Sequence, residues 1–121
     1  MIFGIGTDIV EISRIKSSVE KWGETFLNRV FTSAEIAYCS KNKNPYPCFA
    51  ARFAAKESVI KAFGGLSDIG SLKNIEILNE SSGKPYVNIL QSIDSGMNIH
   101  LSISHEKGHA IASVVLERKD K

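Results

Sequence analysis

The segment FAAKESVIKAFG, residues 53–64, constrains the fold most strongly, because it has helical spacing yet carries charged side chains among its apolar ones. At about 100° per residue, the apolar stripe that should face the core comprises Phe49, Phe53, Ile60 and Phe63. Lys56 falls inside this stripe, Glu57 at its edge and Lys61 just outside it. Charged side chains that face the core in this way need oppositely charged or hydrogen-bonding groups beside them, because burying an unpaired charge is unfavourable.

Two interpretations of Glu57 and Lys61 are open from this helix alone. In the simpler one, they form an exposed i, i+4 ion pair, which stabilises a helix by about 0.3 kcal/mol. In the other, the half-buried carboxylate belongs to a site that handles charge, since burying an unpaired carboxylate is strongly unfavourable. Other segments of the chain are needed to choose between them.

The size and composition of the chain predict one globular domain spanning residues 1–121. A net charge of +2 argues against general nucleic-acid binding, which needs a concentrated basic face. The apolar run MIFGIGTDIV has no basic leader, and no run reaches membrane-spanning length, so we expect neither a signal peptide nor a membrane protein. Cys39 and Cys48 lack CxxC spacing, and we expect reduced structural thiols in a cytoplasmic protein.

Residues 2–10 alternate as a strand that carries an acid, Asp8, on its apolar face. Gly4 and Gly6 share that face and would leave room for the close approach of a ligand. Alternatively, Asp8 caps the turn that follows the strand. Both interpretations of Asp8 are open at this level.

Three helices are predicted between residues 12 and 65. The first covers residues 12–22, with Ile12, Ile15, Val19 and Trp22 on its apolar stripe and basic side chains facing solvent. Thr32 and Glu35 form a capping box, which predicts a second helix running toward Lys41. The third should run from about Pro47 to the glycine pair at residues 64 and 65.

Beyond residue 70 the apolar period changes to two, which predicts four strands at residues 75–77, 87–89, 99–103 and 110–116. The turns SSGKP, IDSGM and HEKGH between them favour antiparallel hairpins. The fold class is therefore α+β: an N-terminal strand, then helices, then an antiparallel strand meander.

The residues with chemical potential are Asp8, Glu57, Lys61, Lys84 and His105. Two carboxylates, completed by substrate phosphate oxygens and water, are typical of a Mg²⁺ site, and lysines neutralise phosphate esters. Zinc would need more His and Cys ligands. On residue type alone, His105 is more often a structural histidine, and Lys84 a solvated surface charge.

Four motifs occur in order: GIGTDIVEISRI, FAAKESVIKAFG, SGKPYV and LSISHEKGHAIASVVLE. On these motifs the chain resembles the short-type 4′-phosphopantetheinyl transferases, the holo-acyl-carrier-protein synthase family, over nearly its whole length. The resemblance implies that family's fold and transfer of the phosphopantetheine arm of coenzyme A to a serine of acyl carrier protein. It further implies Mg²⁺ as cofactor, 3′,5′-adenosine bisphosphate as the second product, a cytoplasmic location and a role in fatty acid biosynthesis.

The resemblance also implies roles for single residues. Asp8 and Glu57 would ligate Mg²⁺, and Lys61 would assist the leaving group. The coenzyme A contacts would be Arg52, Lys61, Lys84, Pro85 and His105. The acyl carrier protein, typically acidic, would contact Arg14 by resemblance, with Lys21 and Arg29 added from charge alone. The serine proton would go to Glu57 or, preferably, to a metal-bound water beside Asp8.

Family members of this length are usually trimers with active sites between subunits, so the resemblance implies a homotrimer. The loop GGLSDIG departs from the Gly-Thr-Gly turn of relatives, and no coenzyme A contact is assigned to it. Two alternatives are kept: another Mg²⁺-dependent enzyme acting on a nucleotide-like phosphate, and a non-catalytic oligomeric binding module. Coenzyme A consumption tests the first, and a Glu57→Ala substitution without effect would favour the second.

Overall fold

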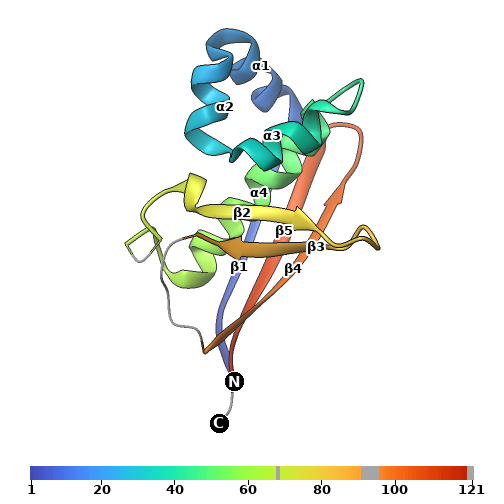
Figure 1. Cartoon of the computed structure of the whole chain (residues 1–121). Coiled ribbons are helices and arrows are strands. Elements are labelled where there is room, and N and C mark those ends of the chain that lie inside the picture. Colours follow the sequence, from blue (N-terminus) through green and yellow to red (C-terminus); the bar gives the residue numbers. More distant parts are fainter. Residues whose placement is uncertain (68, 91–95, 120–121) are drawn as a thin grey trace.

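The computed structural model describes residues 1–67, 69–90 and 96–119, and within them the chain runs through one strand, four α-helices and four further strands (Figure 1). The elements are β1 (Ile2–Glu11), α1 (Ile12–Trp22), α2 (Glu24–Val30), α3 (Ser33–Ser40), α4 (Tyr46–Phe63), a 3₁₀ turn (Leu72–Asn74), β2 (Ile75–Asn79), β3 (Pro85–Ile89), β4 (Met97–His105) and β5 (His109–Arg118). This order confirms the predicted α+β class. The loop GGLSDIG includes residue 68, which lies outside the described residues.

The five described strands form two sheets. The larger is antiparallel with the order β1-β5-β4, and β2 and β3 form a separate hairpin that runs across the direction of the larger sheet in Figure 1. The hairpins at SSGKP and HEKGH are therefore confirmed. The predicted meander is wrong at its middle connection, because β3 and β4 belong to different sheets; residues 93–95 of the IDSGM turn lie outside the described residues.

Strand β5 takes the central place in the larger sheet because its alternate residues are apolar and buried along its whole length. These are Ala110, Ala112, Val114 and Leu116. With β4 on one side and β1 on the other, β5 brings the two ends of the fold together, and Arg118 N donates to Met1 O at 2.8 Å. The pairing sets Asp8 opposite Ala112, on the face that α4 covers.

Helix α4 packs unusually close to β1. A Cβ atom on Gly6 would lie 1.9 Å from Ser58 O, and one on Gly4 would lie 1.9 Å from Ala62 O. The expectation that these glycines make room for a ligand is therefore wrong, because the group that approaches them is the backbone of α4. Ser58 Oγ also lies 3.0 Å from Ala112 O, which ties the same helix to β5.

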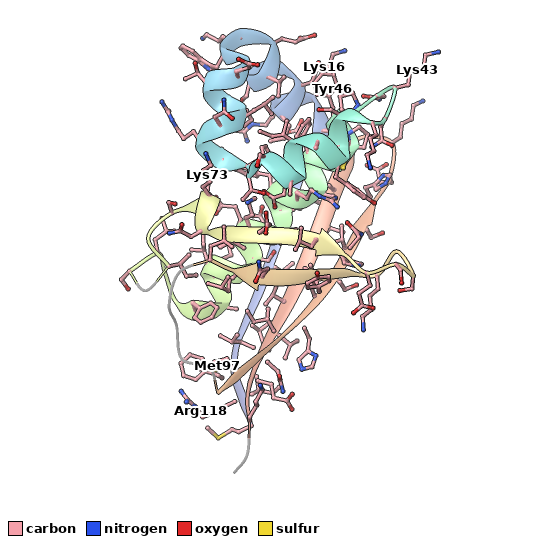
Figure 2. All side chains as sticks on the ribbon, viewed as in Figure 1. Lys16, Lys43, Tyr46, Lys73, Met97 and Arg118 are labelled. Atoms are coloured by element: carbon pink, nitrogen blue, oxygen red, sulfur yellow. A yellow bond between two sulfur atoms is a disulfide. The ribbon has the colours of Figure 1, made fainter. Side chains whose placement is uncertain are left out.

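Helix α4 is buried on most of its sides and not only along the predicted stripe. Ala50, Ala54, Ala55 and Val59 are fully buried, since the sheet covers one side while α1, α3 and β2 contact others. Figure 2 shows Lys16 of α1 beside Tyr46 in the first turn of α4, with Nζ 5.8 Å from the ring centroid. No described helix is long and apolar enough to cross a membrane.

The charge inside the α4 stripe, Lys56, forms a buried ion pair with Glu35 of α3. Both side chains are fully buried, and Nζ lies 2.8 Å from Glu35 Oε1. Lys56 also donates to Leu72 O at 3.1 Å and to Ile75 O. Glu35 accepts in addition from Thr32 N at 2.9 Å and from Ile77 N at 2.7 Å. One carboxylate thus completes the predicted capping box and joins α3, α4 and β2.

Two further sequence expectations are wrong. Gly23, with φ of 55°, ends α1 and allows the unpredicted helix α2 to start, and Trp22 is 58% exposed instead of facing the core. Cys39 and Cys48 are not free thiols: they form a disulfide, because the loop between α3 and α4 returns the chain until their Cα atoms are 5.4 Å apart.

Candidate functional site

Asp8 and Glu57 line one cavity of about 470 Å³, with Arg14 and His109 also on its wall. Asp8 lies there because the even-numbered residues of β1 face α4. Glu57 lies on α4, next to the buried Lys56 in the sequence. The other lining residues are the polar Glu11 and Ser18 and the apolar Ile9, Val10, Ile15, Phe26 and Phe53. Two acids from distant segments therefore meet in one partly apolar space.

Lys61 pairs with Asp8 and not with Glu57. Its Nζ lies 3.1 Å from Asp8 Oδ1 and donates to Thr7 O at 2.9 Å. The simpler interpretation, an i, i+4 pair on the surface of α4, is therefore wrong. Asp8 does not cap the following turn either, because the residue at the N-cap of α1 is Glu11.

The environment of Glu57 favours its protonated form. Burial raises the pKa of Glu57 above its usual value, and the negative charge of Asp8 raises it further, while Lys61 lowers it. The effect of Asp8 on the pKa of Glu57 has the sign expected for repulsion between two carboxylates. An additional positive charge between them would relieve this repulsion.

This pair of acids fits a divalent cation with oxygen ligands. Within the described residues, no group of three or more His, Cys, Asp or Glu side chains is placed to hold a metal ion. Mg²⁺ commonly uses only one or two protein carboxylates and fills its shell with water and substrate phosphate oxygens. The donor set of Asp8 and Glu57 therefore suits Mg²⁺ better than zinc.

A second cavity, of about 520 Å³, brings together Arg52, Pro85 and His105. Arg52 is 5% exposed; its guanidinium lies 4.4 Å from the ring centroid of Tyr38 and donates from Nη2 to Asn79 Oδ1. Its Nε is buried and has no hydrogen-bond acceptor among the residues that the structure describes. Burial lowers the pKa of Arg52, but an arginine keeps its charge in proteins.

The two cavities share no lining residue. Arg52 and Glu57 are five positions apart on α4, which places them about 140° apart around the helix axis. A single chain thus presents its acidic group and its Arg52 group on different sides of one helix. They can serve one ligand only if that ligand reaches around the helix or if a second chain supplies one of them.

The remaining predicted site residues, Lys84, Lys21 and Arg29, do not line either of the two cavities. Lys84 has an exposed side chain in the β2–β3 turn, between Gly83 and Pro85 of the second cavity wall. Lys21 and Arg29 are exposed and line neither cavity; Lys21 Nζ lies 5.1 Å from the Trp22 ring centroid. Tyr38 and Asn79, which hold Arg52, were not predicted, because both contacts are tertiary and have no local sequence signal.

A family model described as the 4′-phosphopantetheinyl transferase superfamily matches residues 4–114. The chain belongs to this superfamily. The match includes every residue that the sequence assigned to a site, from Asp8 to His105. The identification made from the four sequence motifs is thereby confirmed.

Relatives within the 4′-phosphopantetheinyl transferase superfamily agree in length. A protein of Halothermothrix orenii named holo-[acyl-carrier-protein] synthase is 51% identical over 97% of this chain and 98% of its own. The structure of a holo-(acyl-carrier-protein) synthase from Bacillus anthracis, in complex with CoA (3′,5′-ADP), has a TM-score of 0.85 at 38% identity, covering 98% of this chain and 99% of that one. The Helicobacter pylori holo-[acyl-carrier-protein] synthase, in complex with coenzyme A, has a TM-score of 0.80 at 33% identity, covering 93% and 99%.

Proposed function

We propose that this chain transfers the 4′-phosphopantetheine arm of coenzyme A to a serine of apo acyl carrier protein and releases 3′,5′-adenosine bisphosphate. The observation that carries the proposal is the meeting of Asp8 and Glu57 in one cavity, with Lys61 paired to Asp8, on a chain of this superfamily. The names of the relatives support the carrier protein as acceptor, and the ligands in their titles support coenzyme A as donor. We place the reaction in the cytoplasm and in fatty acid biosynthesis.

The reaction is a phosphoryl transfer, for which positioning and charge neutralisation are the main requirements. A bond forms between the serine oxygen and the β-phosphorus of coenzyme A, the bond from that phosphorus to the adenosine bisphosphate breaks, and the serine proton passes to a water beside Asp8 or to Glu57. Lys61 Nζ, already held by Thr7 O and Asp8, neutralises charge on the leaving phosphate. Mg²⁺, held by Asp8 and Glu57, supplies positive charge to the pyrophosphate when it is bound.

Arg52 and His105 fit the phosphorylated adenosine end of coenzyme A. Arg52 has a fixed guanidinium, and His105 is exposed on the wall of the same cavity. Pro85 also lines this cavity, and Lys84 precedes it in the turn between β2 and β3. A buried arginine whose Nε has no acceptor within the described part of the chain is well suited to a phosphate ligand.

A homotrimer would let the two cavities act on one coenzyme A molecule. The face of the larger sheet that points away from α4 exposes apolar side chains to water: Ile5 is 66% exposed and Ile9 63%. Contiguous exposed apolar side chains often mark a protein–protein interface. Ile9 pairs with Ile111, so these residues form one patch across β1 and β5. We propose that this patch joins protomers, with the Arg52 cavity of one beside the Asp8 cavity of the next.

Mixing two inactive variants tests this arrangement. Arg52→Ala removes one half of the proposed site and Glu57→Gln the other, so each homotrimer should be inactive. Chains mixed and refolded at equal amounts should recover about a quarter of the wild-type activity, since random assembly places the two intact halves together at that frequency. Two inactive chains that stay inactive in mixed trimers would contradict a shared site.

Intact-mass spectrometry tests the reaction itself. Apo acyl carrier protein incubated with this chain, coenzyme A and Mg²⁺ should gain the mass of one phosphopantetheine, and EDTA should abolish the gain. Glu57→Gln should be inactive, whereas Glu80→Gln, which changes an exposed acid outside both cavities, should retain activity. No mass gain from the folded wild-type chain would reject the proposal.

A further inference from the structure

We propose that Cys39 and Cys48 form a thiol–disulfide exchange site whose oxidised state strengthens coenzyme A binding in the Arg52 cavity. The inference rests on the proposed function, because it assigns the ligand of that cavity. It concerns a covalent bond that the transfer reaction does not use. Its basis is the position of the disulfide in the cavity wall.

The disulfide spans residues 40–47, which include the loop of residues 41–45 between α3 and α4. Cys48 itself lines the Arg52 cavity, and so do Asn42 and Asn44 of the loop and Pro47 of α4. Figure 2 shows Lys43 of the same loop extending away from the body of the protein. When the disulfide is intact, it links the two helices on either side of this loop covalently. When the disulfide is reduced, the loop is held only by its chain connections to α3 and α4.

Cys39 of the disulfide is next in sequence to Tyr38, which contacts Arg52. Cys39 is fully buried, and Tyr38 has its ring 4.4 Å from the Arg52 guanidinium carbon. Tyr38 also lines the cavity. The bond therefore holds the last turn of α3 at the distance that places Tyr38 against Arg52. Freeing that turn loosens the arginine on its Tyr38 side, and ordering it again costs binding free energy.

The rest of the fold does not depend on the bond. The first turn of α3 is fixed by its capping box and by the buried pair of Glu35 with Lys56. Helix α4 is held along its length by β1 and β5. Opening the disulfide should therefore change the loop and the end of α3 while the protein stays folded.

The two cysteine residues differ in exposure, and we infer from this difference which sulfur a reductant attacks. Cys39 is fully buried, whereas Cys48 is half-buried and lines the cavity. A thiolate of a dithiol reductant attacks Cys48 Sγ, the bond to Cys39 Sγ breaks, and the Cys39 thiolate takes a proton. The second thiol of the reductant then displaces Cys48 as a thiol, so the dithiol loses two electrons and the protein gains them.

Reduction and ligand binding should be linked in both directions. If the oxidised state binds the ligand more tightly, the ligand must favour the oxidised state by the same factor. A ligand in the cavity also stands between the reductant and Cys48. Bound 3′,5′-adenosine bisphosphate should therefore slow reduction by a dithiol.

The test measures affinity and thiol content on the same samples. Wild-type protein is oxidised or treated with dithiothreitol, thiols are counted by alkylation and intact mass, and the Kd for coenzyme A is measured by calorimetry. We expect zero thiols in the first sample, two in the second, and about tenfold weaker binding in the second. Cys48→Ser should bind like the reduced protein, and Cys39→Ala/Cys48→Ala should not respond to dithiothreitol.

The outcomes separate this inference from the proposed function. Equal affinity in the oxidised and reduced proteins, or two free thiols after oxidation, would overturn the inference alone. Absence of coenzyme A binding in both states would overturn the proposed ligand and the inference together. Thermal melting checks that each sample is folded, and if Cys48→Ser does not fold, the two states of the wild type still make the comparison without a substitution.

Discussion

Lys61 Nζ lies 3.1 Å from Asp8 Oδ1, although the two residues are 53 positions apart in the chain. The pair joins α4 to β1, and its Asp8 lines the same cavity as Glu57. Lys61 is itself exposed, so its ion pair with Asp8 contributes little to stability. An exposed lysine held by two oxygens, one of them from an acid that lines the cavity, is better explained by the reaction than by the fold.

Lys61→Ala should reduce the turnover number by about 10- to 100-fold, because it removes a positive charge needed as the leaving phosphate develops. Coenzyme A affinity should change much less, as expected for an interaction that strengthens in the transition state. Steady-state kinetics and calorimetry check the two quantities. Lys73→Ala, an exposed lysine outside both cavities, is the matched control. An increase in KM alone would argue against this role of Lys61.

Glu57→Gln should abolish transfer while slightly stabilising the metal-free protein. Because the folded state raises the pKa of Glu57, it holds this proton more tightly than the unfolded chain. The contribution to stability is therefore lost as pH rises from the ordinary value of 4.5 through the raised pKa. At neutral pH the gain should be at most about 0.5 kcal/mol, because solvent screens a half-buried group.

Urea unfolding at a series of pH values without Mg²⁺ measures this effect of Glu57. The wild type should lose stability relative to Glu57→Gln as pH rises through the window, and added Mg²⁺ should reverse the order. Glu80→Gln controls for the loss of one surface charge. Parallel stability curves for the wild type and Glu57→Gln would show that folding does not raise the pKa of Glu57.

Gly6→Ala should destabilise the fold by about 2 to 4 kcal/mol, because the added Cβ would overlap Ser58 O and push α4 away from β1. Gly108→Ala is the control, since its nearest contact would be Glu106 Oε1 at 3.4 Å. Chemical denaturation gives both values. A loss in Gly6→Ala no larger than that in Gly108→Ala would mean that α4 and β1 do not approach as described.

Lys56→Met should destabilise the fold by about 3 to 5 kcal/mol, because it leaves the Glu35 carboxylate buried without its cation. In Glu35→Gln/Lys56→Met the loss should be smaller, since the amide oxygen still accepts from Ile77 N and no buried charge is left. Unfolding of both single variants and the double variant gives the coupling energy. Additive losses would contradict a direct ion pair.

Arg14→Glu should raise the KM for acyl carrier protein without changing coenzyme A affinity, because Arg14 lines the cavity from the basic side of α1. The increase should shrink as salt is added, since ions screen exposed charges. Lys119→Glu makes the same charge change outside both cavities. A salt-independent increase would indicate a packing effect of Arg14.

Local signals explain what the sequence predicted well. Thr32 and Glu35 are three residues apart, so their capping box can be recognised without the rest of the fold. The alternation of β5 and the helical spacing of α1 are local in the same sense. Glu57 at the edge of the apolar stripe left two interpretations open, and the tertiary contact of Lys61 with Asp8 was needed to exclude the i, i+4 pair.

The features that the sequence could not predict depend on contacts between distant segments. Nothing near Lys56 indicates that its partner is Glu35, and nothing near Gly6 indicates that a helix backbone will lie against it. The Cys39–Cys48 bond follows from the path of a loop, which residue spacing alone does not fix. The separation of the Arg52 and Asp8 cavities needed the helix to be placed among its neighbours.

The pairing of β1 with β5 has a consequence during protein synthesis. The strand that carries Asp8 emerges first, but the strand that it must pair with is the last of the described strands to be made. The nascent chain therefore cannot seat Asp8 beside Glu57 until translation of β5 is finished, and such distant pairings also slow folding. A ribosome-bound or truncated chain lacking β5 would thus hold an incomplete acidic site.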